Sequence, residues 1–131
     1  MINRLAGKKV YIAGKVTGQE EIAKKRFGDA EKAINNFSPT SSVMNPTILP
    51  LGFKHNDYLR ICIEMLKSCD VMIVLPNWQP SVGVQMELDV ALAEDIDIYF
   101  LGDLLSEKDL LFSNDDCDTT DIYRAMHRLC R

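Results

Sequence analysis

Hydrophobic residues along the chain show two patterns, which take turns from one segment to the next. Short apolar runs with little polar alternation are typical of strands that are buried on both faces of a parallel sheet. The segments between them carry apolar residues three and four positions apart, which is typical of amphipathic helices. Predicted strands cover residues 10–13, 42–44, 71–75 and 96–101, and predicted helices cover residues 20–37, about 57–68, and a segment that begins after Ser81.

Strands that alternate with helices of this length predict an α/β fold, with a parallel sheet, right-handed crossovers and helices on both faces. A length of 131 residues is consistent with one domain, residues 1–131. Its expected core covers residues 8–101, followed by an extension with a last helix at about 119–130. Apolar residues within 104–112 are expected either to complete the core or to form a subunit contact.

The central stretch of the chain is Asp70–Ala93, a predicted buried strand, loop and helix. In its helix, Val84, Leu88 and Ala91 form an apolar stripe, and Glu87 borders that stripe instead of facing away from it. The crevice at the carboxyl end of such strands is where open α/β sheets bind ligands. Glu87 is therefore a candidate nucleophile or base, although an acid near a helix start also fits the helix dipole.

Several other residues near the predicted crevice have both a structural and a functional interpretation. Ser81 is a plausible helix N-cap, but with Gly83 it also offers an anion seat at the helix start. Gly14 and Gly18 permit a tight turn and close ligand approach, a weak signal on its own. Three further sets remain open between the two interpretations: Asp70 as a cap or site acid, His55 and Asp57 at the start of the second helix, and Tyr11 and Trp78 as core or base-stacking rings.

Composition limits the classes of partner and cofactor that we expect for this protein. The net charge of −4 gives no reason to expect a nucleic acid polymer or an anionic membrane as partner, and no apolar run approaches the length of a membrane span. Cys62, Cys69, Cys117 and Cys130 form no CxxC pair. Cys62 and Cys69 lie in or beside predicted buried elements, and we interpret them as reduced core thiols of an intracellular, cytoplasmic protein. Neither histidine has ligand spacing to a cysteine, so we expect no zinc or other metal site. We also expect no cofactor.

The order of these features resembles the nucleoside 2-deoxyribosyltransferase superfamily. The resemblance covers about residues 8–101 and rests on Ala13-Gly14 with Gly18 beyond it, on Asp70, and on the spacing Ser81-x-Gly83-x-x-x-Glu87. That spacing is closest to the 2'-deoxynucleoside 5'-monophosphate N-hydrolases, because the transferases typically have an aspartate at the position of Ser81. The segment from Asn45 to Tyr58 and Leu75-Pro76-Asn77-Trp78 are more similar to an uncharacterised bacterial and phage branch.

The resemblance implies a Rossmann-like, flavodoxin-type sheet of four to five strands and an enzyme that acts on the N-glycosidic bond of a nucleotide. It implies that Glu87 attacks the anomeric carbon, that Asp70 touches sugar hydroxyls, and that part of the site comes from a neighbour in a homodimer or larger homo-oligomer. The leaving base needs an acid, for which Asp57, His55 and Asn77 are candidates in that order. The expected catalytic residues are Glu87 and Asp70, and the expected substrate-binding residues are Tyr11, Gly14, Gly18, Asn45, Asp57, Asn77, Trp78, Ser81 and Gly83.

Two further expectations concern the position of Glu87 and the role of residues 45–58. Glu87 is expected to project into the crevice within a few ångströms of Asp70, where burial and the second acid would both raise its pKa. Residues 45–58 are expected to decide base selectivity and to be mobile without ligand. Two other functions stay open: a module that binds a nucleotide without chemistry, and an interaction protein that uses residues 104–112.

Overall fold

The computed structural model describes residues 4–16, 18–76 and 81–102. The order of elements expected from the sequence is confirmed over this range, with helix and strand ends that differ by up to two residues. One short turn, η1, is additional. The expected helix at 119–130 and the apolar residues within 104–112 lie outside the described residues. The elements are β1 (Lys9–Ala13), α1 (Glu20–Phe37), β2 (Ser42–Met44), η1 (Pro46–Ile48), α2 (His55–Lys67), β3 (Val71–Val74), α3 (Val82–Ala93) and β4 (Asp97–Phe100).

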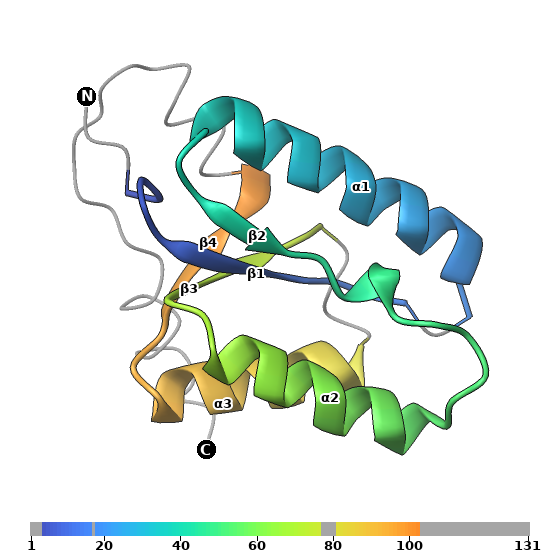
Figure 1. Cartoon of the computed structure of the whole chain (residues 1–131). Coiled ribbons are helices and arrows are strands. Elements are labelled where there is room, and N and C mark those ends of the chain that lie inside the picture. Colours follow the sequence, from blue (N-terminus) through green and yellow to red (C-terminus); the bar gives the residue numbers. More distant parts are fainter. Residues whose placement is uncertain (1–3, 17, 77–80, 103–131) are drawn as a thin grey trace.

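The described strands form one parallel sheet in the order β2-β1-β3-β4. Helix α1 covers one face of this sheet, and α2 and α3 cover the other (Figure 1). This is the strand order of flavodoxin-like domains, so the predicted Rossmann-like α/β class is confirmed. The order reverses between β1 and β3, because β2 lies beyond β1 on one side and β4 beyond β3 on the other.

Alternate residues of the central strands enter two separate cores. Val10 and Ile12 pack with the apolar stripe of α1, which includes Phe27. Tyr11 and Met72 point to the opposite face, among the buried residues of α2 and α3. Because both faces are covered, the strands need apolar residues at every position, which explains the unbroken runs in the sequence.

The helix stripes read from the sequence are buried as expected. In α1, Ala23, Phe27, Ala30 and Ile34 are buried, and the helix ends before Ser38-Pro39. In α3, Val84, Leu88 and Ala91 are buried, and Glu87 is buried with them. No helix in the described part of the chain combines the length and apolarity needed to cross a membrane.

Candidate active site at the carboxyl edge of the sheet

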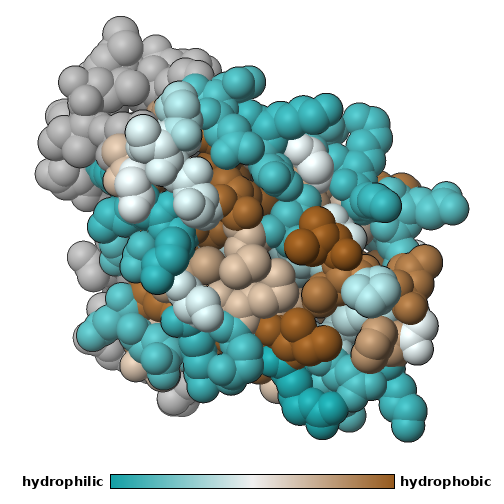
Figure 2. Space-filling view, in the orientation of Figure 1, coloured by the Kyte–Doolittle hydropathy of each residue, from teal (hydrophilic) through white to brown (hydrophobic). Residues whose placement is uncertain are grey.

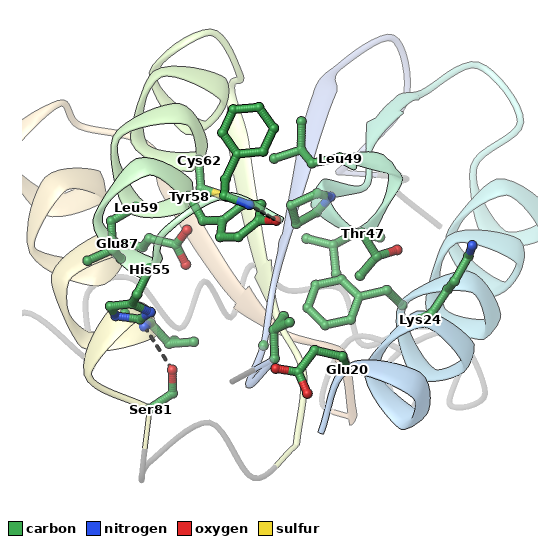
Figure 3. Close-up of a pocket in the computed structure, with 18 of the residues that line it drawn as sticks. Glu20, Lys24, Thr47, Leu49, His55, Tyr58, Leu59, Cys62, Ser81 and Glu87 are labelled. Carbon is green, nitrogen blue, oxygen red and sulfur yellow. Dashed lines mark hydrogen bonds between the residues drawn. The ribbon is translucent and has the colours of Figure 1, made fainter. Parts of the chain in front are cut away.

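A pocket of about 490 Å³ opens at the carboxyl edge of the sheet. This volume falls within the usual range for small-molecule sites. Side chains from α1 on one side and from α2 and α3 on the other point into the same space (Figure 3). Apolar surface forms a band across this face of the molecule, between largely hydrophilic regions (Figure 2).

Topology explains where the pocket forms. In a parallel sheet each helix that follows a strand begins at the carboxyl edge, so the first turns of α1, α2 and α3 all line the pocket. The strand order reverses between β1 and β3, and the connections diverge there to leave a crevice. Tyr11 and Gly14 lie at the β1 side of this crevice.

Glu87 is the buried carboxylate of the site. It extends from the second turn of α3, lines the pocket and is only 6% exposed. Its carboxylate accepts a hydrogen bond from the phenol of Tyr11. Burial raises the pKa of Glu87 to about 7, against the lowering effect of the Tyr11 hydrogen bond. The group therefore changes its charge near neutral pH, as a catalytic acid, base or nucleophile requires.

Tyr11 is a fully buried partner of this carboxylate, with a side chain that is 1% exposed. Burial, and next the negative charge of Glu87, raise the pKa of Tyr11 well above its usual value. The phenol therefore stays protonated and acts as a donor. The thiol of Cys62 also lines the pocket and interacts with the phenol, and burial raises the pKa of this thiol.

The start of α3 faces the pocket without an acidic residue in its first turn. The predicted N-cap is confirmed, since the Ser81 hydroxyl accepts a hydrogen bond from the Val84 backbone N–H at 3.2 Å. By contrast, α1 carries Glu20 and Glu21 in its first turn, and α2 carries Asp57. Unlike α1 and α2, helix α3 therefore has no acidic side chain in its first turn to compensate the positive end of its dipole.

The glycines of the site differ in what they permit. A Cβ on Gly14 would lie 3.1 Å from both Phe27 and Leu75, so this glycine allows α1 to pack closely on the sheet. A Cβ on Gly83 would lie 3.2 Å from the tip of Leu59, beside the pocket. Gly18 has a positive φ of +80°, its N–H donates to Glu20, and it is not among the residues that line the pocket. Gly18 thus serves the turn into α1.

The expected proximity of Asp70 to Glu87 is wrong. Asp70 precedes β3, so it lies at the amino edge of the sheet, whereas the pocket is at the carboxyl edge. Its carboxylate accepts a hydrogen bond from the Lys9 backbone N–H at 3.0 Å, which ties the starts of two strands together. The raised pKa of Glu87 follows from burial and owes nothing to a second acid at Asp70.

Asp57 and Asn45 shape the pocket without lining it. The Asp57 carboxylate accepts from the Lys54 backbone N–H and pairs with Arg60, so it closes the first turn of α2. Asn45 is buried; its amide donates to Glu31 at 3.0 Å, and its oxygen accepts from the Thr47 backbone N–H at 2.9 Å. The expected contacts of Asn45 and Asp57 with a ligand are therefore not supported by their positions.

Asn77 and Trp78 lie outside the described residues. Of the three candidate acids for the leaving group, His55 lines the pocket, and Asp57 does not.

The structure adds pocket residues that the sequence reasoning did not single out, among them Glu20 and Lys24 on α1. Their signal was available, because every helix after a strand of a parallel sheet begins at the ligand-binding edge. Phe53 and Tyr58 also line the pocket, and they belong to residues 45–58, the segment expected to decide base selectivity. Glu20 also lies in the first turn of α1, where its negative charge suits the positive end of the helix dipole. In the described residues no cluster of three or more His, Cys, Asp or Glu side chains is placed to hold a metal ion.

The fold is similar to that of a solved enzyme, the 2-deoxyribosyltransferase of the psychrotolerant bacterium Bacillus psychrosaccharolyticus, described as a biocatalyst for the synthesis of nucleosides. The TM-score is 0.55, with 16% sequence identity over 70% of each chain. This similarity establishes a shared fold, the one that the resemblance in sequence predicts. No protein of curated function matches the sequence significantly. A family model described as a domain of unknown function, DUF4406, matches residues 8–100, and the chain belongs to that family.

Proposed function

We propose that the protein cleaves the N-glycosidic bond of a nucleoside 5'-monophosphate, or transfers its (deoxy)ribosyl group, with Glu87 as nucleophile. The observation that carries this proposal is a buried carboxylate that lines a pocket and accepts a hydrogen bond from Tyr11. A pKa of about 7 leaves a substantial ionised fraction at neutral pH. A carboxylate in such a place costs stability, which favours a functional reason for its presence.

The proposed reaction follows the double-displacement pattern of retaining glycosidases. An ionised Glu87 oxygen attacks the anomeric carbon while the bond from that carbon to the base nitrogen breaks, through an oxocarbenium-like transition state. The base leaves with the bonding electrons and takes up a proton. Water, or the nitrogen of a second base, then attacks the same carbon and releases the Glu87 carboxylate. The phenol of Tyr11 holds that carboxylate in one orientation throughout.

Protonation of the leaving base is assigned to His55 in this proposal. His55 begins α2 and lines the pocket. General acid catalysis of this kind contributes about 10²–10⁴ in rate. Asp57 is a weaker candidate, because its carboxylate is engaged by the Lys54 backbone N–H and by Arg60 and does not line the pocket. Asp70 belongs to the opposite edge of the sheet, so the proposal gives it no role at the reacting atoms.

The 5'-phosphate is placed at the start of α3. Free backbone N–H groups there attract an anion, and Gly83 leaves room beside the pocket. Ser81 presents its hydroxyl at the same point. Lys24 brings a positive charge to the opposite wall of the pocket, from α1, where Glu20 and Glu21 also line it. A phosphate at this point would agree with the resemblance to the monophosphate hydrolases, whereas hydrolysis and transfer both remain within the proposal.

The fold similarity to a 2-deoxyribosyltransferase supports glycosyl transfer chemistry in general terms. As a further part of the proposal, the protein forms a homodimer or a larger homo-oligomer, whose mass light scattering would give.

A direct test incubates the protein with a panel of ribo- and deoxyribonucleoside 5'-monophosphates, and with the matching nucleosides, and measures free base by chromatography. Addition of a second, isotopically labelled base distinguishes transfer from hydrolysis, because only transfer places the label in nucleotide. The Glu87→Gln variant is the control, since it keeps the shape and removes the nucleophile. Base release from the variant at the wild-type rate would refute the proposed role of Glu87.

A module that binds a nucleotide without cleaving it is the second candidate. Asp70 lies at the opposite edge of the sheet from the pocket, so one of the two predicted catalytic acids is absent from the site. This absence favours the binding module. Saturable nucleotide binding by calorimetry, with no release of base from any member of the panel, would support the binding module over the enzyme.

A further inference from the structure

The mouth of the pocket carries an exposed aromatic ring. Phe53 lines the pocket and is 53% exposed, and Leu51 beside it is 83% exposed. Both belong to the connection between η1 and α2. Large apolar side chains that stay exposed at the edge of a cavity contribute little to the folded core, so they indicate a binding surface.

Tyr58 fixes the position of this ring. It lies in the first turns of α2, and its hydroxyl donates to the Pro50 carbonyl at 2.7 Å and accepts from the Phe53 backbone N–H at 3.1 Å. The Tyr58 hydroxyl thus binds the backbone on both sides of residues 51 and 52, which form the tip of the connection. The rings of Phe53 and Tyr58 also meet edge to face, with centroids 6.0 Å apart and an interplanar angle of 65°.

The start of α2, the helix that carries Tyr58, is itself held in place by a hydrogen bond. Lys54 and Asp57 close the first turn of α2 through the Lys54 backbone N–H and the Asp57 carboxylate, 3.1 Å apart. Phe53 is therefore placed before a ligand arrives, so binding does not have to order it.

We propose that Phe53 determines specificity for the planar aromatic part of the ligand, and that Tyr58 is the positioning residue that presents it. The identification of that planar part as a nucleobase rests on the proposed function. Stacking on an aromatic side chain suits any flat base, so Phe53 distinguishes a ligand with a base from one without, rather than one base from another.

The test compares three ligands, two of which share a sugar phosphate. Binding of a deoxynucleoside 5'-monophosphate, of 2-deoxyribose 5-phosphate and of the free base is measured by calorimetry in the Glu87→Gln background, which removes the proposed nucleophile and so prevents cleavage during the titration. Phe53→Ala should weaken the nucleotide and the free base about tenfold, the range expected for one lost stacking contact, and leave the sugar phosphate unchanged. Phe53→Trp should restore affinity, while Phe53→Leu, equally apolar but not aromatic, should not.

Ile48→Ala is the matched control. Ile48 is 73% exposed in the same region of the chain but does not line the pocket, so its removal should change none of the three affinities. Tyr58→Phe keeps the ring and removes the two hydrogen bonds. It should raise KM for the nucleotide several-fold with kcat little changed, and it should leave the sugar phosphate affinity as it was.

The outcomes separate this inference from the proposed function. Phe53-dependent binding of nucleotide and free base without any base release would retain the inference and refute the glycosidase. Base release with a KM that Phe53→Ala does not change would refute the inference and retain the glycosidase. Equal weakening of the nucleotide and the sugar phosphate by Phe53→Ala would also refute the inference, because Phe53 would then act only as part of the wall.

Discussion

The phenol of Tyr11, on strand β1, donates a hydrogen bond to the carboxylate of Glu87, on helix α3, across 76 positions of sequence. Both side chains are buried, so the bond forms where the local dielectric is low and its effect is large. Burial alone favours the protonated form of Glu87, and the Tyr11 bond favours the ionised form. The two opposing effects keep the pKa of Glu87 within reach of neutral pH.

Removal of the phenol should therefore shift the pH dependence of activity. If Glu87 must be ionised to attack, kcat/KM rises with pH through an apparent pKa of about 7 in the wild type. Tyr11→Phe removes the stabilising donor, so the pKa of Glu87 rises and the acidic limb of the profile moves to higher pH. The measurement is kcat/KM for base release between pH 5 and 9. An unshifted limb, with activity lowered equally at every pH, would contradict this role of Tyr11.

The raised pKa also predicts how stability depends on pH. The unfolded reference for Glu87 is 4.5 and the folded pKa is about 7, so between these values the folded state holds more protons than the unfolded state. The free energy of unfolding therefore falls as pH rises through this window. Above it, the ionised buried carboxylate costs roughly 3 kcal/mol relative to acid pH, by the free-energy equivalent of this pKa difference.

Glu87→Gln should abolish this dependence, because an amide does not titrate. Denaturant unfolding at pH 4 and at pH 8 measures it: the variant should be more stable than the wild type at pH 8, and the difference should shrink toward pH 4. Equal stability of the two proteins at both pH values would mean that Glu87 is solvated in the folded protein.

The helical period predicted where Glu87 would point, but it did not predict the partner. The spacing of Val84, Leu88 and Ala91 fixed the buried side of α3, and Glu87 on its border proved buried with them. Tyr11 contacts Glu87 only through tertiary packing of two elements distant in sequence, which a local pattern does not encode.

Other errors came from ignoring chain direction or from local hydrogen bonding. Asp70 precedes its strand, and in a parallel sheet this position belongs to the edge opposite the ligand site. Direction alone would have excluded it. Asp57 and Asn45 lie in the expected region, but their short polar side chains are engaged by nearby backbone N–H groups. Such local bonds are common for Asp and Asn and compete with a functional role.

Substitutions at Ser81 can separate its capping role from the proposed phosphate contact. Ser81→Ala removes the acceptor for the Val84 N–H and should cost about 1 kcal/mol of stability. Ser81→Asp preserves the cap but places a negative charge at the proposed phosphate seat. Its stability should match the wild type, while affinity for a nucleoside monophosphate falls more than tenfold and affinity for the nucleoside stays within a factor of three. Equal losses for both ligands would argue against a phosphate at this helix start.

Two of the glycines that line the pocket, Gly14 and Gly83, should respond to alanine in opposite ways. Gly14→Ala places a methyl group 3.1 Å from Phe27 and Leu75 in the packed core, and overpacking of this kind costs about 1–3 kcal/mol. Gly83→Ala meets the flexible end of Leu59 at 3.2 Å and the Ser81 hydroxyl at an ordinary contact distance of 3.8 Å, and it gains the helix propensity of alanine, about 1 kcal/mol. Thermal unfolding should show a lower Tm for the first variant and an unchanged or higher Tm for the second. If Gly83 also admits the phosphate, its variant loses monophosphate affinity in spite of that stability.

The connection between β2 and α2 should be mobile only at its tip. Asn45 holds the Thr47 backbone N–H at one end, and the Tyr58 hydroxyl holds the Phe53 backbone N–H at the other. Amide hydrogen exchange of Thr47 and Phe53 should therefore be slower than that of Leu51 and Gly52, which lie between these anchors. A bound nucleotide should slow exchange at the tip, because the tip lines the pocket.

Each anchor can be released separately to test this prediction. Asn45→Ala should accelerate exchange at Thr47 and leave Phe53 unchanged, and Tyr58→Phe should do the reverse, since each variant removes the acceptor of only one of the two amides. Uniformly slow exchange from 45 to 58 in the ligand-free protein would contradict the mobility of the tip. Uniformly fast exchange would mean that neither side chain holds the connection, and Phe53 would then reach its position only when ligand binds.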